Sequence, residues 1–139
     1  MISIRPGESG DHDAVLKLWE STDLGKAAPD EWNALINGPT SAILIAEDGD
    51  EVIGTAIATY DGWRAYIYHV AVAVPRRREG IARRLMDEAE QHLIQAGARY
   101  VYVMVGEHRT DGLALVTGNG YLPEGDVVLA KRLAVRVAM

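Results

Sequence analysis

Short apolar runs alternate along this chain with segments in which apolar residues recur every three or four positions, and glycine, proline or aspartate stands at most of the breaks. Apolar runs of this length, alternating or continuous, are typical of strands. They predict strands over residues 2–5, 41–47, 51–60, 66–74, 100–105 and 127–137. The turn residues Asp48-Gly49-Asp50 predict a hairpin, so we expect the second, third and fourth strands to run antiparallel in succession.

Helical spacing replaces this pattern in four segments, which are residues 11–21, 29–36, 81–96 and 110–119. The last of these is the weakest helix prediction, because it contains two glycines. The predicted order of elements is therefore β-α-α-β-β-β-α-β-α-β. A crossover helix between the fourth and fifth strands makes those two strands parallel. The order predicts one mixed α/β (α+β) domain over residues 1–139, without repeats or linkers.

Composition narrows the class of protein. The 139 residues are 48% hydrophobic and carry a net charge of −6, which is ordinary for a globular domain and argues against general nucleic-acid binding. The absence of cysteine excludes a thiolate nucleophile and a cysteine-based zinc site, and the histidines lack metal-ligand spacing. No apolar run approaches the ~18–20 residues that span a bilayer. We expect a cytoplasmic protein that binds neither metal nor membrane.

Five of the fourteen basic residues crowd into residues 76–84, where the fourth strand gives way to a helix. Cations at a helix N-terminus are disfavoured by the macrodipole, whereas the free N–H groups there bind anions. The segment is therefore interpreted as a site for a phosphate-bearing ligand. The competing interpretation is a solvated helix start, partly neutralised by Arg83–Asp87 and Arg84–Glu88 ion pairs.

The spacing Arg77-x-x-Gly80-x-Ala82 resembles the Arg/Gln-x-x-Gly-x-Gly/Ala signature of the GNAT family of N-acetyltransferases. The order of elements resembles a GNAT domain from the first strand to the last. Residues 115–121, which end in Gly-Tyr, resemble the family's tail. The resemblance implies a GNAT fold with splayed fourth and fifth strands, and acetyl-CoA in the gap between them, with its pyrophosphate on the turn's backbone N–H groups.

The same resemblance implies residue roles. A strand-four N–H near Val70 or Val72 would polarise the thioester carbonyl. The implied cofactor-binding residues are Val70, Ala71, Val72, Arg77, Arg78, Glu79, Gly80, Ile81, Ala82, Arg83 and Arg109. Tyr66 stands where some relatives have a catalytic glutamate. His69 has a suitable intrinsic pKa for a general base, although a hydrogen-bonded core histidine is the alternative. A proton relay through water is a third route.

Three positions depart from the family pattern. Val116 stands where a tyrosine usually protonates the leaving thiolate, so Tyr121 or water is considered as a substitute acid. Arg109 stands where an asparagine is often found, and it either reaches the ligand or is solvated. Pro75 lies one residue closer than usual to Arg77, which changes the turn only slightly.

These features predict an acetyl-CoA-dependent N-acetyltransferase that acts by direct attack on a primary amine of a small molecule or peptide. The alternative is a non-catalytic CoA-binding sensor or interaction module. The acceptor site is expected at the first two helices and the turn after the third strand, where Asp23 or Asp61 would attract a cationic amine. Its expected walls are Trp19, Asp23, Trp32 and Trp63. For Trp19 and Trp32 a core role is favoured. An exposed edge at the final strand predicts a homodimer.

Overall fold

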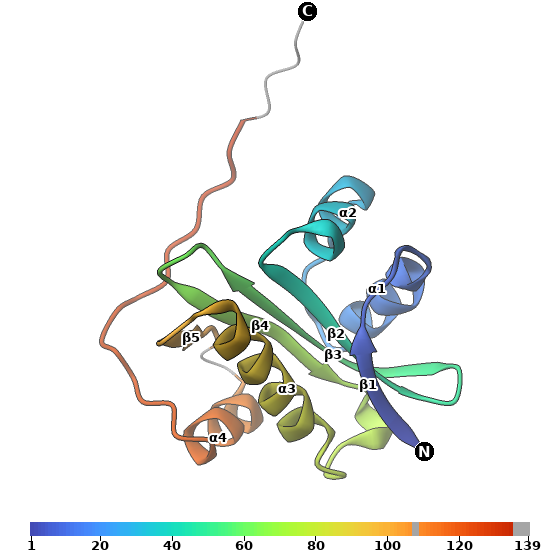
Figure 1. Cartoon of the computed structure of the whole chain (residues 1–139). Helices are drawn as coiled ribbons and strands as arrows, with labels where there is room; N and C mark the ends of the chain where they lie inside the picture. Colours follow the sequence, from blue (N-terminus) through green and yellow to red (C-terminus); the bar gives the residue numbers. More distant parts are fainter. Residues whose placement is uncertain (107–108, 135–139) are drawn as a thin grey trace, which may run out of the picture.

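The computed structural model describes residues 1–106 and 109–134. One five-stranded sheet has the order β1-β2-β3-β4-β5, antiparallel except for the parallel pair β4–β5 (Figure 1). Its strands are β1 (Ile2–Pro6), β2 (Ser41–Asp48), β3 (Glu51–Tyr60), β4 (Ala65–Val72) and β5 (Val101–Val103). This mixed α/β architecture confirms the predicted fold class.

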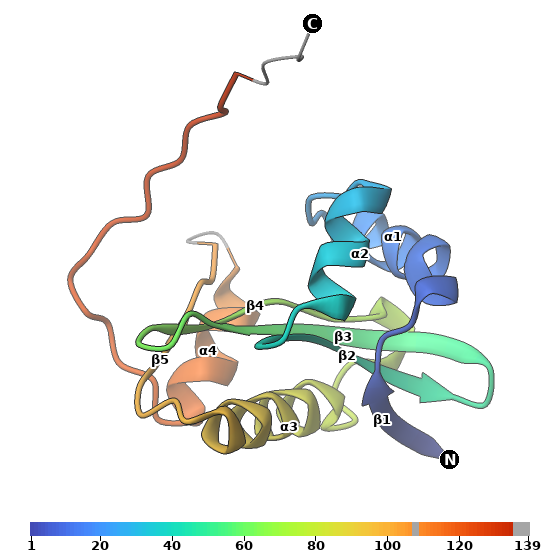
Figure 2. The same cartoon turned by 45° about the horizontal axis from the view of Figure 1, so that its top comes forward.

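Helices cover both faces of the sheet, with α1 and α2 on one side and α3 and α4 on the other (Figure 2). The helices are α1 (His12–Ser21), α2 (Pro29–Asn37), α3 (Ile81–Ala96) and α4 (Thr110–Gly118), with 3-10 turns η1 (Ser9–Asp11) and η2 (Val74–Arg76). Leu85 and Leu93 of α3 pack into one core cluster, and Trp19 and Trp32 into the other. No helix within the described residues is long and apolar enough to cross a membrane.

The two central strands β3 and β4 pair with a register shift, and β4 loses its other neighbour halfway along. Thr55 pairs with Ala71, but Ile57 pairs with Tyr68, so β4 carries an extra residue between these points. On the opposite side, β5 pairs only with Ala65–Ile67 of β4. The rest of β4 therefore has a free side, which confirms the predicted splay.

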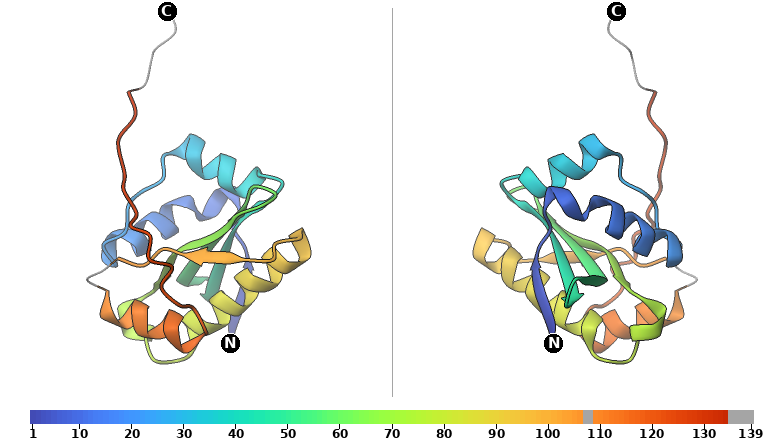
Figure 3. Two further views of the ribbon diagram at one scale, coloured as in Figure 1. Left: turned by 90° about the vertical axis from the view of Figure 1, so that its left-hand side faces the viewer. Right: turned by 90° about the vertical axis from the view of Figure 1, so that its right-hand side faces the viewer.

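The final predicted strand is wrong over its described part, because residues 127–134 form no strand. A strand is stable only beside a hydrogen-bonded neighbour, and this segment runs past the β5 edge and away from the domain instead (Figure 3). Val127 and Leu129 are consequently 80% and 88% exposed. Residues 135–137 of that prediction lie outside the described residues. The strand predicted over residues 100–105 is shorter, at Val101–Val103.

Candidate functional site

In the turn between β4 and α3, the first N–H groups of α3 have no capping side chain. Gly80 is the N-cap of α3 with φ +78°, and Arg78 also has a left-handed φ of +68°. No side chain caps the helix, and the bond from the Arg84 N–H to the Gly80 carbonyl, 3.1 Å long, closes its first turn. The N–H groups before Arg84 are free of intrahelical partners. A Cβ at Gly80 would meet no heavy atom within 4 Å, so the turn borders open space.

The cations of this turn are only partly neutralised. The Arg76 guanidinium lies 3.1 Å from Glu79 and 3.0 Å from Asp48, so this arginine is paired. Arg78 and Arg83 are exposed, and neither forms an ion pair with another described residue.

The neutralised-helix interpretation needed two ion pairs along α3. Neither the Arg83–Asp87 pair nor the Arg84–Glu88 pair forms, although all four residues are among those described. Arg84 instead donates to the backbone carbonyl of Ile2, at 3.4–3.5 Å. The positive charge at the start of α3 thus remains available to an anion.

The free side of β4 presents backbone groups to the gap. The Ala73 N–H donates to the Ile53 carbonyl of β3 at 2.8 Å. Because backbone groups of a strand alternate in direction, Val72 and Val70 direct theirs to the opposite side, where β4 has no neighbour. Arg77 lies at the same side, where its Nε donates to the Val72 carbonyl at 3.3 Å. The Val70 N–H thus faces the gap without a strand partner.

His69 occupies the bulge of β4 with a left-handed φ of +49°. Its Nε2 donates to the carbonyl of Gly25 at 3.1 Å, and its ring lies edge-on to Trp19, with centroids 4.8 Å apart. Burial lowers the pKa of His69, so the neutral imidazole is favoured. With Nε2 as donor, Nδ1 carries the lone pair, which leaves this histidine able to accept a proton.

Thr55 supports the bulge from β3, and sequence reasoning did not identify it. Its hydroxyl donates to the His69 carbonyl at 3.1 Å and accepts from the Trp19 Nε1–H at 2.9 Å. The side chain is fully buried. The sequence does carry a signal for this role, which is a threonine between apolar residues of β3. A hydroxyl that is buried there needs hydrogen-bond partners from neighbouring elements.

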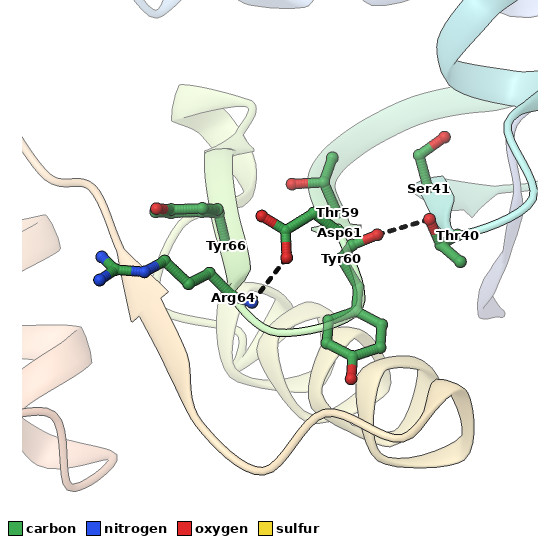
Figure 4. A pocket seen from close by; sticks show the side chains of 7 residues that line it. All are labelled: Thr40, Ser41, Thr59, Tyr60, Asp61, Arg64 and Tyr66. Atoms are coloured by element: carbon green, nitrogen blue, oxygen red, sulfur yellow. Dashed lines mark hydrogen bonds between the residues drawn. The ribbon is translucent and has the colours of Figure 1, made fainter.

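Two adjoining pockets lie beside Tyr66 and Thr59, which line both of them. The smaller, about 220 Å³, lies at the β3–β4 turn, where Tyr66 and Asp61 face each other across the opening (Figure 4). The larger, about 550 Å³, extends past Tyr68 and Met104 to residues 127–129. Burial raises the pKa of Tyr68. Together the pockets lie along Tyr66 and Tyr68 of β4, next to the point where β4 loses its pairing with β5.

Tyr121 and Val116 lie on the other face of the sheet. The Tyr121 hydroxyl donates to Glu90 of α3 at 2.6 Å. Burial, and to a smaller extent the hydrogen bond to Glu90, raises the pKa of Tyr121 above the ordinary tyrosine value. Val116 is 6% exposed within the core cluster of α3. The phenol of Tyr121 is therefore a weak acid, already hydrogen-bonded, and Val116 serves packing.

Arg109 immediately precedes α4 and contacts backbone carbonyls of the loop that follows α1. Its Nη2 donates to the carbonyl of Thr22 at 2.8 Å and to that of Asp23 at 2.7 Å. Its predicted role in cofactor binding stays a prediction.

The residues expected to form the acceptor site separate into two groups, one buried and one exposed. Trp19 and Trp32 are buried in the core beneath α1 and α2, as favoured from the sequence. Asp23, Asp61 and Trp63 are exposed. The Asp61 carboxylate accepts hydrogen bonds from the Arg64 and Trp63 backbone N–H groups, and these bonds lower the pKa of Asp61. Within the described residues, no group of three or more histidine, aspartate or glutamate side chains could hold a metal ion.

Comparison with protein families identifies the same region. The model described as the acetyltransferase (GNAT) family matches residues 12–121, which include every helix and the whole β4–α3 turn. This match extends over most of the chain.

Solved structures share the fold at low identity. A transcriptional regulator from Bacillus halodurans C-125 is 17% identical, with a TM-score of 0.83 over 95% of this chain and 100% of that one. An aminoglycoside acetyltransferase from an uncultured soil metagenomic sample, in complex with sisomicin, is 18% identical, with a TM-score of 0.74 over 96% and 97%. The aminoglycoside N-acetyltransferase AAC(6')-Iy, in complex with a CoA-containing bisubstrate analogue, is 15% identical, with a TM-score of 0.79 over 96% and 99%.

Proposed function

This chain belongs to the acetyltransferase (GNAT) family, and from that membership we propose that it transfers an acetyl group from acetyl-CoA to a primary amine of a small molecule or peptide. The observation that carries the proposal is the β4–α3 turn. Its uncapped N–H groups, its open space at Gly80 and the unpaired charges of Arg78 and Arg83 suit a pyrophosphate. A location in the cytoplasm, expected from the sequence, belongs to the same proposal.

The gap beyond Ile67 suits the rest of the cofactor. The backbone groups of Val70 and the Val72 N–H face it without a strand partner and can hydrogen-bond the amides of an extended ligand, whereas the Val72 carbonyl accepts from Arg77. When bound, acetyl-CoA supplies the thioester whose acyl carbon accepts the amine. The Val70 or Val72 N–H would donate to the acyl oxygen as negative charge develops there. The C–N bond forms, the C–S bond breaks, and the sulfur leaves as a thiolate.

The attacking amine must lose a proton. His69 is the candidate base in this proposal, because it is neutral, lies in the bulge beside Val70, and carries its lone pair on Nδ1. Tyr66, which lines both pockets, is the second candidate. Tyr121 is less suited to protonating the thiolate, since its hydroxyl is held by Glu90. A thiol with a pKa of about 8.5 can leave without a dedicated acid.

One observation favours a second function. Val116 packs in the core where the family usually places its acid, so a domain that binds CoA without turnover is the alternative. Release of free CoA from acetyl-CoA, measured with a thiol reagent across a panel of diamines, aminoglycosides and lysine peptides, tests both. Amine-dependent release is expected. Tight CoA binding without release on any amine would instead establish the alternative.

The proposal includes a homodimer. The outer edge of β5 has no strand partner among the described residues, and the apolar side chains of Val127, Leu129 and Leu133 are exposed nearby. An unpaired edge and an exposed apolar segment favour pairing between two copies. Light scattering is expected to give twice the chain mass, and Leu129→Glu is expected to shift it toward the monomer. A monomeric wild type would remove this part of the proposal.

A further inference from the structure

The loop between α1 and α2, residues 22–28, is bound by side chains that are distant in the sequence. Its carbonyls accept four hydrogen bonds, from Arg109 to Thr22 and Asp23, from His69 to Gly25, and from His12 to Ala27, at 2.7–3.1 Å. The donors come from α1, the bulge of β4 and the start of α4. These contacts fix a segment without regular structure to three elements of the domain.

Arg109 makes the longest-range of these contacts. The C-terminus of a helix exposes carbonyls and carries negative potential, and the last turn of α1 contains no basic residue. The Arg109 guanidinium supplies the missing cation from 86–87 residues away. It also holds Asp23, whose φ of +60° is strained for a residue with a side chain.

The position of this contact relates it to the gap. Arg109 follows β5 in the chain, and His69 lies in β4, so the loop is tied to the segments on both sides of the gap. His69 also feels the positive charge of Arg109, which contributes to its lowered pKa. An incoming amine that approaches His69 must therefore pass beside this loop.

We propose that Arg109 is a positioning residue, whose guanidinium fixes the α1–α2 loop beside the gap and so shapes the acceptor entrance. Both hydrogen bonds of the guanidinium come from Nη2, at 2.7 and 2.8 Å, so the proposal assigns this arginine to the loop and not to the cofactor phosphate. The part of this inference that concerns the acceptor rests on the proposed function; the fixing of the loop does not.

Hydrogen exchange tests the loop without any assay of activity. The N–H groups of Asp23 and Leu24 donate to carbonyls of α1, so their protection reports on the loop. In Arg109→Gln, exchange over residues 22–28 is expected to rise by about tenfold or more, because the loop opens locally. Arg109→Lys, which keeps the charge, should restore part of the protection. Arg99→Gln is the matched control, because Arg99 is exposed and forms no ion pair with another described residue.

Calorimetric titration with CoA separates this role from cofactor binding. The proposal expects Arg109→Gln and Arg99→Gln to bind CoA within about twofold of wild type, since neither loses a phosphate contact. Unchanged loop exchange in Arg109→Gln, or CoA affinity reduced about tenfold or more in that variant alone, would overturn it. Where an amine is turned over, the acceptor KM should rise while the acetyl-CoA KM stays constant. The exchange and titration results decide the proposal even if no amine is turned over.

Discussion

The β4–α3 turn and the α1–α2 loop both lie beside the half of β4 that has no partner strand, but they differ in whether their backbone groups have hydrogen-bond partners. At the β4–α3 turn, no side chain caps the first N–H groups of α3, and a Cβ at Gly80 would meet only open space. In the α1–α2 loop, carbonyls are bound by Arg109, His69 and His12 from three other elements. The N–H groups of the β4–α3 turn, called the incomplete loop below, have no capping side chain. The carbonyls of the α1–α2 loop, called the complete loop, have side-chain partners without a ligand.

The difference indicates how the work of the site is divided. Unpartnered donors are tolerated where water or an anion replaces the missing acceptor, so in the proposed function the turn binds the cofactor. Bound carbonyls reduce the freedom of a loop before any ligand binds, which lowers the entropy lost on binding. In the proposed function this loop is a wall of the acceptor site that is already ordered before a ligand binds.

The largest effect is expected from closing the turn. Gly80→Asp places a carboxylate where the proposed pyrophosphate lies, and juxtaposed like charges cost several kcal/mol, or at least about 100-fold in CoA affinity. Gly80→Asn has the same size and a similar tolerance of positive φ, so its smaller loss measures the steric part. Titration calorimetry with CoA checks both variants.

The matched control for this prediction is Gly49→Asp. Gly49 also has a positive φ, +61°, and a Cβ there would also meet nothing within 4 Å. It lies in the β2–β3 hairpin beside Asp48, which pairs with Arg76, so this variant adds the same strain and charge at the edge of the turn but outside the Gly80 site. The assignment of the turn fails if a folded Gly80→Asp protein binds CoA as tightly as Gly49→Asp does.

The incomplete loop was predictable from the sequence, and the complete one was not. A phosphate turn depends on backbone N–H groups, so it constrains residues close together in the chain, and Gly80 and Ala82 record that constraint. The fixed loop depends on contacts such as Arg109 to Thr22, which no local pattern records. Strand periodicity gave most of the sheet for the same reason, since alternation is local.

Two errors of sequence reasoning have a physical origin in pairing. Apolar alternation over residues 127–137 predicted a strand, but alternation does not specify a neighbour, and β5 remains the edge in the described residues. The bulge at His69 was likewise not predicted, because one extra residue changes the register without changing the apolar pattern. Both depend on long-range geometry.

A second prediction concerns Thr55, whose hydroxyl holds the His69 bulge that in turn binds the α1–α2 loop. Thr55→Val removes the hydroxyl that joins Trp19 to the His69 carbonyl, so a buried donor and acceptor lose partners at a cost of about 1–3 kcal/mol. Urea denaturation should show this loss of unfolding free energy. Thr55→Ser keeps the hydroxyl and should recover most of it. If Val is tolerated and Ser is not, packing of the methyl group matters instead.

A third, smaller effect is expected from the exposed cations of the turn. Arg78→Gln and Arg83→Gln should each weaken CoA binding by about two- to fivefold at low salt, because exposed charge pairs contribute at most about 1 kcal/mol. The loss should shrink in high salt. Arg84→Gln is the control, since its guanidinium faces the Ile2 carbonyl. Equal losses in all three variants would indicate a general effect of charge rather than a phosphate contact.

The smallest effect concerns protonation of His69 beneath the complete loop. Its folded pKa is lowered by burial, so the unfolded chain binds more protons as the pH drops below about 6.5, and stability falls with it until the folded pKa is passed. His69→Asn keeps an N–H donor and tolerates positive φ, so it should lose stability less steeply below pH 6.5. The other histidines are common to both proteins, so the difference between their urea midpoints from pH 7.5 to 5 isolates His69. Parallel curves would mean that the pKa of His69 is the same in the folded and unfolded chains.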